Sequence, residues 1–292
     1  MKNTLSVALL QQAIDIDYNK TLNMFLHEVE KAAAKGAQLV CLPELHMGPY
    51  FPITENFEHF NRAESIPGPT TDAFSALAKK LNIVIVCSIF ERRAAGIYHN
   101  TAVVLEKDGS IAGIYRKMHI PDDPGFYEKY YFTPGDLGFT PIKTSVGNLG
   151  VLVCWDQWYP EAARIMALKG ADLLIYPTAI GYHKDSKSGF LKDRDAWQTI
   201  QRSHAIANAL PVLVINRVGY EQDPNGLVEG TQFWGHSFIA GPQGEIIQQA
   251  GDDIETLSAD IDLSETETIR RFWPFLRDRR IDAYEGILQR YL

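Results

Sequence analysis

Residues 149–169 read LGVLVCWDQWYPEAARIMALK and join an apolar run to an amphipathic segment through a short polar turn. Residues 149–153 have the composition of a strand that is buried on both faces. A helix is predicted over 159–169, because Pro160 is tolerated in a first helical turn. Cys154 closes the strand, which is where α/β proteins place groups that face a ligand. The stretch therefore predicts an α/β fold with chemistry at a strand end.

The same alternation of apolar runs and amphipathic segments extends along the chain. Further strands are predicted over 6–10, 38–42, 83–89, 101–106, 111–115, 173–176, 212–216, 237–240, 245–248 and 257–261. Further helices are predicted over 71–81 and 196–209, and between the caps Asp17 and Gly36. The mixture of βα units and hairpins predicts α/β layers with mixed sheets. More than ten strands favour two stacked sheets in one domain.

Composition excludes several classes of protein. The 292 residues are 46% hydrophobic and 11% aromatic, which excludes a disordered chain. A net charge of −8 argues against a nucleic-acid binder or an anionic-membrane binder, since both need a basic face. No apolar run approaches the roughly 20 residues of a membrane span, and the start of the chain does not resemble a signal peptide. Three widely separated cysteines predict a reduced, cytoplasmic protein without a disulfide framework or a structural zinc site.

The cysteines differ in their surroundings. Cys41 and Cys87 lie inside apolar runs and are predicted to be core residues. Cys154 stands at a strand end before a helix, whose N-terminus favours a thiolate. Glu44 and Lys117 also follow predicted strands, although each alone could be an ordinary surface charge.

Together these three residues form a set suited to acyl transfer. Glu44 would take the proton of the Cys154 thiol, and the thiolate would attack a carbonyl carbon. Lys117 and the backbone N–H of Trp155 would stabilise the oxyanion. The motifs of dinucleotide-binding, P-loop and zinc-protease proteins are absent, and the elbow motif of serine hydrolases is incomplete at Ile239.

The sequence resembles the nitrilase (carbon–nitrogen hydrolase) superfamily over nearly its whole length. The resemblance rests on three ordered segments: Leu42-Pro43-Glu44, Tyr115-Arg116-Lys117 and Cys154-Trp155-Asp156. It implies an α/β fold, a four-layer αββα sandwich of two mixed β-sheets flanked by helices, and the catalytic triad Glu44, Lys117 and Cys154. It also implies catalytic support from Glu128, which would otherwise be read as a salt-bridge residue of a loop. The mechanism requires no metal and no organic cofactor.

The resemblance further implies a dimer or a larger homo-oligomer with exchanged C-terminal arms. We therefore predict a catalytic domain over 1–262 and an arm over 263–292 that packs at a subunit interface. Residues 270–280, RRFWPFLRDRR, give this arm a basic and aromatic character.

The residues after the cysteine motif bear on the substrate. Relatives that hydrolyse N-carbamoyl amino acids carry a cation just beyond this motif, whereas this chain has Gln157 and Trp158. We therefore expect a small-molecule substrate with a cationic amine tail, an N-carbamoyl amine that is hydrolysed to the amine, CO2 and ammonia. Acids and aromatic faces near the motifs are candidates for binding the tail: Tyr50, Asp122, Asp123, Phe126 and Trp155.

Three alternatives remain open. The two aspartates, Asp122 and Asp123, could equally be solvated loop charges. The chain could be a related amidase that acts on an N-carbamoyl acid or an ω-amide. It could also be a catalytically silent family member that serves as a binding subunit, although all three triad positions are present.

Overall fold

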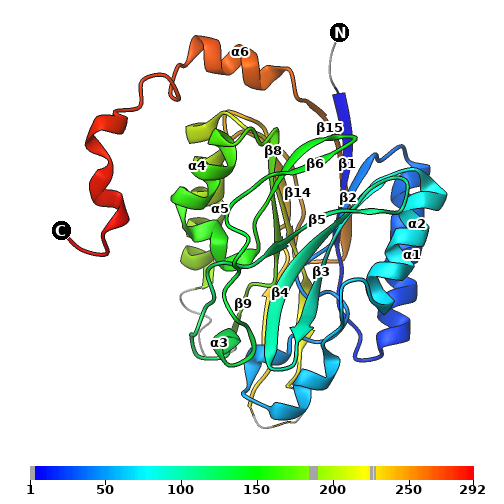
Figure 1. Ribbon diagram of the computed structural model, residues 1–292. Coiled ribbons are helices and arrows are strands. Elements are labelled where there is room, and N and C mark those ends of the chain that lie inside the picture. The colour runs from blue at the N-terminus through cyan, green and yellow to red at the C-terminus, as the bar shows by residue number, and fades with distance from the viewer. Residues whose placement is uncertain (1–3, 184–189, 224–225, 227) are drawn as a thin grey trace.

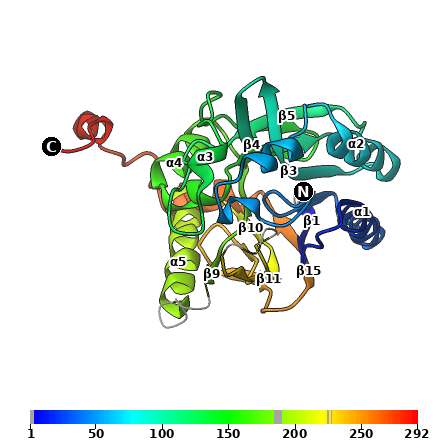
Figure 2. The same cartoon turned by 90° about the horizontal axis from the view of Figure 1, so that it is seen from below.

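Two six-stranded sheets form the centre of the molecule, and helices cover their outer faces (Figure 1). The computed structural model describes residues 4–183, 190–223, 226 and 228–292. The layers follow the order helix, sheet, sheet, helix, and the view from below shows the helices on opposite sides (Figure 2). The predicted αββα sandwich of two mixed sheets is therefore confirmed.

The first sheet has the strand order β15-β1-β2-β3-β4-β5. Strands β1, β2 and β3 run parallel, and the remaining pairs are antiparallel. Their bounds are β1 (Thr4–Gln11), β2 (Leu39–Cys41), β3 (Val84–Ala94), β4 (Ile97–Leu105), β5 (Ile111–Arg116) and β15 (Glu255–Asp262).

The second sheet has the order β14-β13-β10-β8-β7-β6. Strands β7, β8 and β10 run parallel, and the outer pairs are antiparallel. Their bounds are β6 (Ile142–Thr144), β7 (Gly147–Val151), β8 (Leu173–Thr178), β10 (Val212–Asn216), β13 (Phe238–Ala240) and β14 (Ile246–Gln249).

The alternation of side chains along each strand divides the core into layers. Val7 and Leu9 of β1 belong to the cluster between the sheets, whereas Ala8 and Leu10 pack with Phe25 under the helices. Helices α1 (Tyr18–Ala34) and α2 (Pro69–Leu81) cover the first sheet, and α4 (Pro160–Leu168) and α5 (Phe190–Asn208) cover the second. Because both faces of these strands are buried, they appear in the sequence as continuous apolar runs.

Cys41 and Cys87 are both fully buried, as predicted. Their thiols lie in the first sheet, in strands β2 and β3. Burial raises the pKa of each thiol above its ordinary value, so both remain neutral core groups.

A third, small sheet was not predicted from the sequence. It consists of β11 (Val218–Glu221), β12 (Thr231–Trp234) and β9 (Gly181–His183) in that order. Short helical turns complete the described elements: η1 (Phe51–Ile53), η2 (Phe57–Arg62), α3 (Glu128–Tyr131), η3 (Cys154–Trp158), η5 (Ile281–Ala283) and η6 (Glu285–Leu288).

The C-terminal segment leaves the body of the molecule after β15 (Figure 1). Its helix α6 (Glu265–Phe272) buries none of its residues, and Arg270 donates hydrogen bonds to the carbonyl of Asn208. Beyond α6 the chain exposes large apolar side chains, among them Leu288 at 90% and Tyr291 at 92%. Within the described ranges, no helix is long and apolar enough to cross a membrane.

Candidate active site

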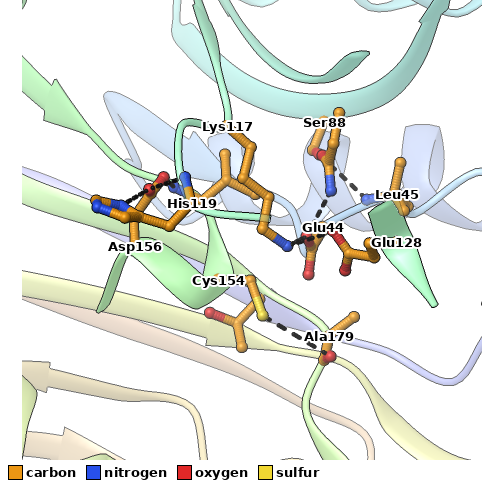
Figure 3. Close-up of polar contacts among 12 residues, drawn as sticks. Glu44, Leu45, Ser88, Lys117, His119, Glu128, Cys154, Asp156 and Ala179 are labelled. Atoms are coloured by element: carbon orange, nitrogen blue, oxygen red, sulfur yellow. Dashed lines mark hydrogen bonds and ion pairs between the residues drawn. The ribbon is translucent and has the colours of Figure 1, made fainter. Parts of the chain in front are cut away.

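Four predicted site residues come from separate parts of the chain and meet at one place, three of them from beyond strand ends. Glu44 lies beyond β2, Lys117 directly follows β5, and Cys154 follows β7. Glu128 opens the short helix α3. The first two belong to one sheet and Cys154 to the other, so the site lies where the two sheets face each other (Figure 3).

Lys117 is the centre of this cluster. Its Nζ lies 2.8 Å from Oε1 of Glu44 and 2.7 Å from Oε2 of Glu128, and all three side chains are buried. Burial alone would lower the pKa of the Lys117 ammonium, but the charges of Glu128 and Glu44 outweigh it and raise the pKa above its ordinary value. Lys117 is therefore a fixed positive charge.

Glu44 uses its two carboxylate oxygens differently. Oε1 accepts hydrogen bonds from Lys117 and, at 2.6 Å, from Nδ2 of Asn100. Oε2 is buried and has no hydrogen-bond partner among the described residues. An unpaired buried carboxylate oxygen is costly. The carboxylate of Glu44 lies close enough to Cys154 for its charge to raise the pKa of the thiol, so this free oxygen is suited to accept a proton.

Glu128 is held from two sides. Its Oε1 accepts a 2.7 Å hydrogen bond from the hydroxyl of Tyr50, and its Oε2 accepts one from Lys117. Burial raises the pKa of Glu128 to about 7, and the neighbouring charge of Glu44 adds to this rise although Lys117 opposes it. The structure thus brings Tyr50 behind Glu128 instead of onto the wall of the cavity described below.

Cys154 has a backbone φ of 43°, a left-handed conformation that is uncommon for a residue with a side chain. Its thiol donates a 3.9 Å hydrogen bond to the carbonyl of Ala179. Burial, followed by the charge of Glu44, raises the pKa of this thiol well above its ordinary value. We expected a helix N-terminus to favour the thiolate. That expectation was wrong, because Cys154 lies in the 3-10 turn η3 and α4 begins only at Pro160.

Asp156 joins the turn of Cys154 to the segment of Lys117. Its Oδ2 accepts hydrogen bonds from the N–H of Val153 at 3.0 Å and the hydroxyl of Tyr115 at 2.8 Å. Its Oδ1 accepts the N–H of His119 at 3.0 Å. The sequence motifs contain these residues, but they did not reveal the hydrogen bonds that Asp156 accepts.

Sequence reasoning also missed Asn100 and Arg217. Asn100 is a fully buried polar residue of β4, but it stands between His99 and Thr101, so no break in an apolar run marks it in the sequence. Arg217 directly follows β10 in the way that Lys117 follows β5. The strand-end rule that selected Lys117 would also have selected Arg217.

A cavity of about 260 Å³ opens onto Cys154 and Glu128. Two predicted substrate-binding residues, Phe126 and Trp155, lie on its wall. The described lining contains Asp123 but not the neighbouring Asp122. It also contains three residues that were not predicted: Tyr182, Asp193 and Trp234. Gln157 is buried and accepts a hydrogen bond from Thr178. Over the described ranges, no group of His, Cys, Asp and Glu side chains could hold a metal ion.

Two stacked mixed sheets with a buried cysteine, lysine and glutamates at their junction are the arrangement of the nitrilase superfamily. The family model of carbon–nitrogen hydrolases matches residues 6–271, and the chain belongs to this family. An N-carbamoylputrescine amidase of Solanum lycopersicum is 44% identical, covering 98% of this chain and 96% of the plant protein. A citrullinase of Francisella tularensis is 40% identical, covering 98% and 99%. The crystal structure of a carbon–nitrogen hydrolase from Helicobacter pylori is 55% identical with a TM-score of 0.96, covering 99% of this chain and 100% of that chain.

Proposed function

We propose that this chain is an amidohydrolase that converts N-carbamoylputrescine to putrescine, CO2 and ammonia, a reaction of polyamine biosynthesis. The chemistry of the cavity carries the proposal. Its described lining contains the carboxylates of Asp123 and Asp193 beside that of Glu128, and it contains no Lys, Arg or His. Such a wall favours an ammonium tail and offers no partner to a carboxylate tail. The similarity to plant N-carbamoylputrescine amidases supports the same substrate.

In the first half of the reaction, Cys154 becomes acylated. Oε2 of Glu44 takes the thiol proton, and the thiolate attacks the ureido carbonyl carbon. Lys117 and the backbone N–H of Trp155 stabilise the oxyanion. The intermediate then collapses, the terminal C–N bond breaks, and Glu44 returns its proton to the departing ammonia.

In the second half, water releases the amine. Glu44 takes a proton from a water molecule, which attacks the carbamoyl thioester, and the protonated Glu44 gives the proton back to the sulfur. The free carbamate then loses CO2 and leaves putrescine. Glu128 supports both halves because its hydrogen bond keeps the Lys117 ammonium in place.

The similarity to a citrullinase favours citrulline as a second candidate. Citrulline has the same ureido group, but its head carries a carboxylate next to the amine. The described cavity wall lacks a cation to bind that carboxylate. We therefore rank the amine substrate first.

A panel of three ureido compounds tests the proposal. Ammonia release is measured with N-carbamoylputrescine, citrulline and N-carbamoyl-β-alanine under the same conditions. We expect kcat/KM for N-carbamoylputrescine to be at least about tenfold above that of the others, the equivalent of about 1.4 kcal/mol. A preference for either acid would overturn the choice of substrate.

We also propose a cytoplasmic homodimer or a larger homo-oligomer, in which residues 263–292 pack on another subunit. The exposed apolar side chains beyond α6 support this role, because a lone subunit would leave them in water. Light scattering of the full chain and of a chain that ends at residue 262 tests it. Equal subunit numbers in both would contradict a role of the arm in assembly.

A further inference from the structure

Residues 44–50 form a short segment that carries functional groups at both ends. Glu44 is at its start, and Tyr50, whose hydroxyl binds Glu128, is at its end. The fully buried side chain of Arg217 holds the backbone between them. Its Nη2 donates 2.7 Å hydrogen bonds to the carbonyls of both Glu44 and Leu45. Its Nη1 donates one of 3.2 Å to the carbonyl of Gly48.

Glu221 connects Arg217 to the far end of the segment through hydrogen bonds. It pairs with Nη1 of Arg217 at 2.8 and 2.9 Å. Its Oε2 also accepts a 2.6 Å hydrogen bond from the N–H of Tyr50. One buried ion pair therefore binds backbone groups at both ends of residues 44–50.

The segment needs such restraint because its backbone is unusual. Leu45 has a φ of 46°, in the left-handed region where residues with a Cβ cost of order 1 kcal/mol or more. The N–H of Leu45 is bound by Oγ of Ser88 at 3.1 Å, and its carbonyl is bound by Arg217. Without the guanidinium, the peptide after Glu44 would relax toward an ordinary conformation and turn the carboxylate away from the cysteine.

The neighbouring residue, Asn216, holds the opposite wall of the site. Its Nδ2 donates to the carbonyl of Ile180 and its Oδ1 accepts the N–H of Ile180, both at 3.0 Å. Ile180 follows Ala179, whose carbonyl binds the thiol of Cys154. Two consecutive side chains at the end of β10 thus fix one segment with Glu44 and another beside Cys154.

We propose that Arg217, together with Glu221, is a positioning residue that holds Glu44 in line with Cys154, while Asn216 fixes the wall across from it. This inference rests on the roles of Glu44 and Cys154 in the proposed function. An ion pair that only stabilised the fold would affect unfolding and leave the reactivity of Cys154 unchanged.

The test compares Arg217→Lys with Arg116→Lys. Lysine keeps the positive charge at 217 but lacks the fork that reaches several carbonyls at once. Arg116 is a matched control, because it is also buried and donates to Glu91 at 2.7 and 2.8 Å. It precedes Lys117 in sequence, which makes it a stringent control.

The readouts are kcat, KM, the midpoint of thermal unfolding, and the pH dependence of Cys154 alkylation by iodoacetamide. For Arg217→Lys we expect kcat to fall at least about tenfold with little change in KM. The alkylation midpoint should move to lower pH, because the charge of Glu44 raises the pKa of the thiol and would now lie farther away. Glu44→Gln should move it in the same direction, and Arg116→Lys should leave it in place.

Glu221→Gln gives a second, milder variant in case Arg217→Lys does not fold. It should show the same changes to a smaller extent. Wild-type kcat and an unshifted alkylation midpoint in a folded Arg217→Lys or Glu221→Gln protein would overturn the proposal, as would equal changes in Arg116→Lys. Alkylation needs no substrate, so it still tests the inference if the wild-type protein fails to hydrolyse N-carbamoylputrescine.

Discussion

Lys117 binds only one of the two carboxylate oxygens of Glu44. Its Nζ lies 2.8 Å from Oε1, whereas Oε2 is buried without a hydrogen-bond partner in the described parts of the chain. The ammonium therefore fixes the direction of the carboxylate while leaving its second oxygen able to accept a proton. In the proposed mechanism the same residue pair orients the base and supplies the positive charge beside the oxyanion.

Replacing Glu44 with Gln should remove the base with little damage to the fold. The amide oxygen can still accept the hydrogen bonds of Lys117 and Asn100. We expect kcat to fall by about 10²–10⁴-fold, the usual contribution of general acid–base catalysis. Ammonia release measures kcat, and circular dichroism checks that the variant is folded. A kcat within tenfold of wild type in the folded variant would contradict the assignment of Glu44.

Lys117→Met should destabilise the protein strongly. It leaves the buried carboxylates of Glu44 and Glu128 without their positive partner, which costs about 3–5 kcal/mol at neutral pH. The loss of stability should be smaller at lower pH, where protonation neutralises the two unpaired carboxylates. Urea unfolding at several pH values measures it. The control is Lys80→Met, which removes an exposed pair with Glu30 and should leave the free energy of unfolding nearly unchanged.

The raised pKa of Glu128 predicts a pH-dependent stability. Between the ordinary carboxyl pKa of 4.5 and about 7, the folded protein keeps a proton that the unfolded chain has released. The contribution of Glu128 to stability is therefore present at low pH and is lost as the pH rises through 7. Glu128→Gln should remove this slope.

Thermal unfolding between pH 5 and pH 8 tests the prediction about Glu128. Wild type should lose stability relative to Glu128→Gln as the pH rises through this range. The exposed Glu55→Gln serves as the control and should follow wild type. Parallel curves for Glu128→Gln and wild type would show that Glu128 does not titrate in this window.

Asp193→Asn should weaken binding of the amine tail. Asp193 lines the cavity, so loss of its charge should raise KM for N-carbamoylputrescine about tenfold, with kcat nearly unchanged. For an N-carbamoyl alkylamine without a terminal ammonium, Asp193→Asn should leave KM unchanged. Asp195→Asn is the control, since Asp195 is an exposed residue of the same helix outside the described lining. Equal effects of the two variants on KM would contradict a role of Asp193 in binding the amine.

Much of the fold could be predicted because burial on both faces makes the central strands of both sheets continuous apolar runs. Strands β9, β11 and β12 escaped prediction because they are short and partly polar. Helix α5 was predicted over 196–209 but begins at Phe190, since its first turns lack apolar periodicity. That early part of the helix contains Asp193, so a cavity residue was missed with it.

In the site, the sequence could indicate residue types at strand ends but not their partners. Cys154 was found because a strong apolar run ends directly before it, and Lys117 was found because it follows the predicted strand 111–115. The hydrogen bonds of Arg217 to residues 44–50 join parts of the chain more than 160 residues apart. No local sequence pattern predicts such a contact. The difference between Asp122 and Asp123 arises in an irregular loop, where no periodicity fixes which side chain faces the cavity.

The most direct test of the central claim measures ammonia release from N-carbamoylputrescine by wild type, Cys154→Ala and Cys87→Ala. Cys87 is the control, because it is a buried cysteine that is not part of the described cavity lining. We predict turnover by wild type and Cys87→Ala, and a loss of at least about a thousandfold in folded Cys154→Ala, as expected for removal of a nucleophile. Substantial turnover by Cys154→Ala would contradict the account.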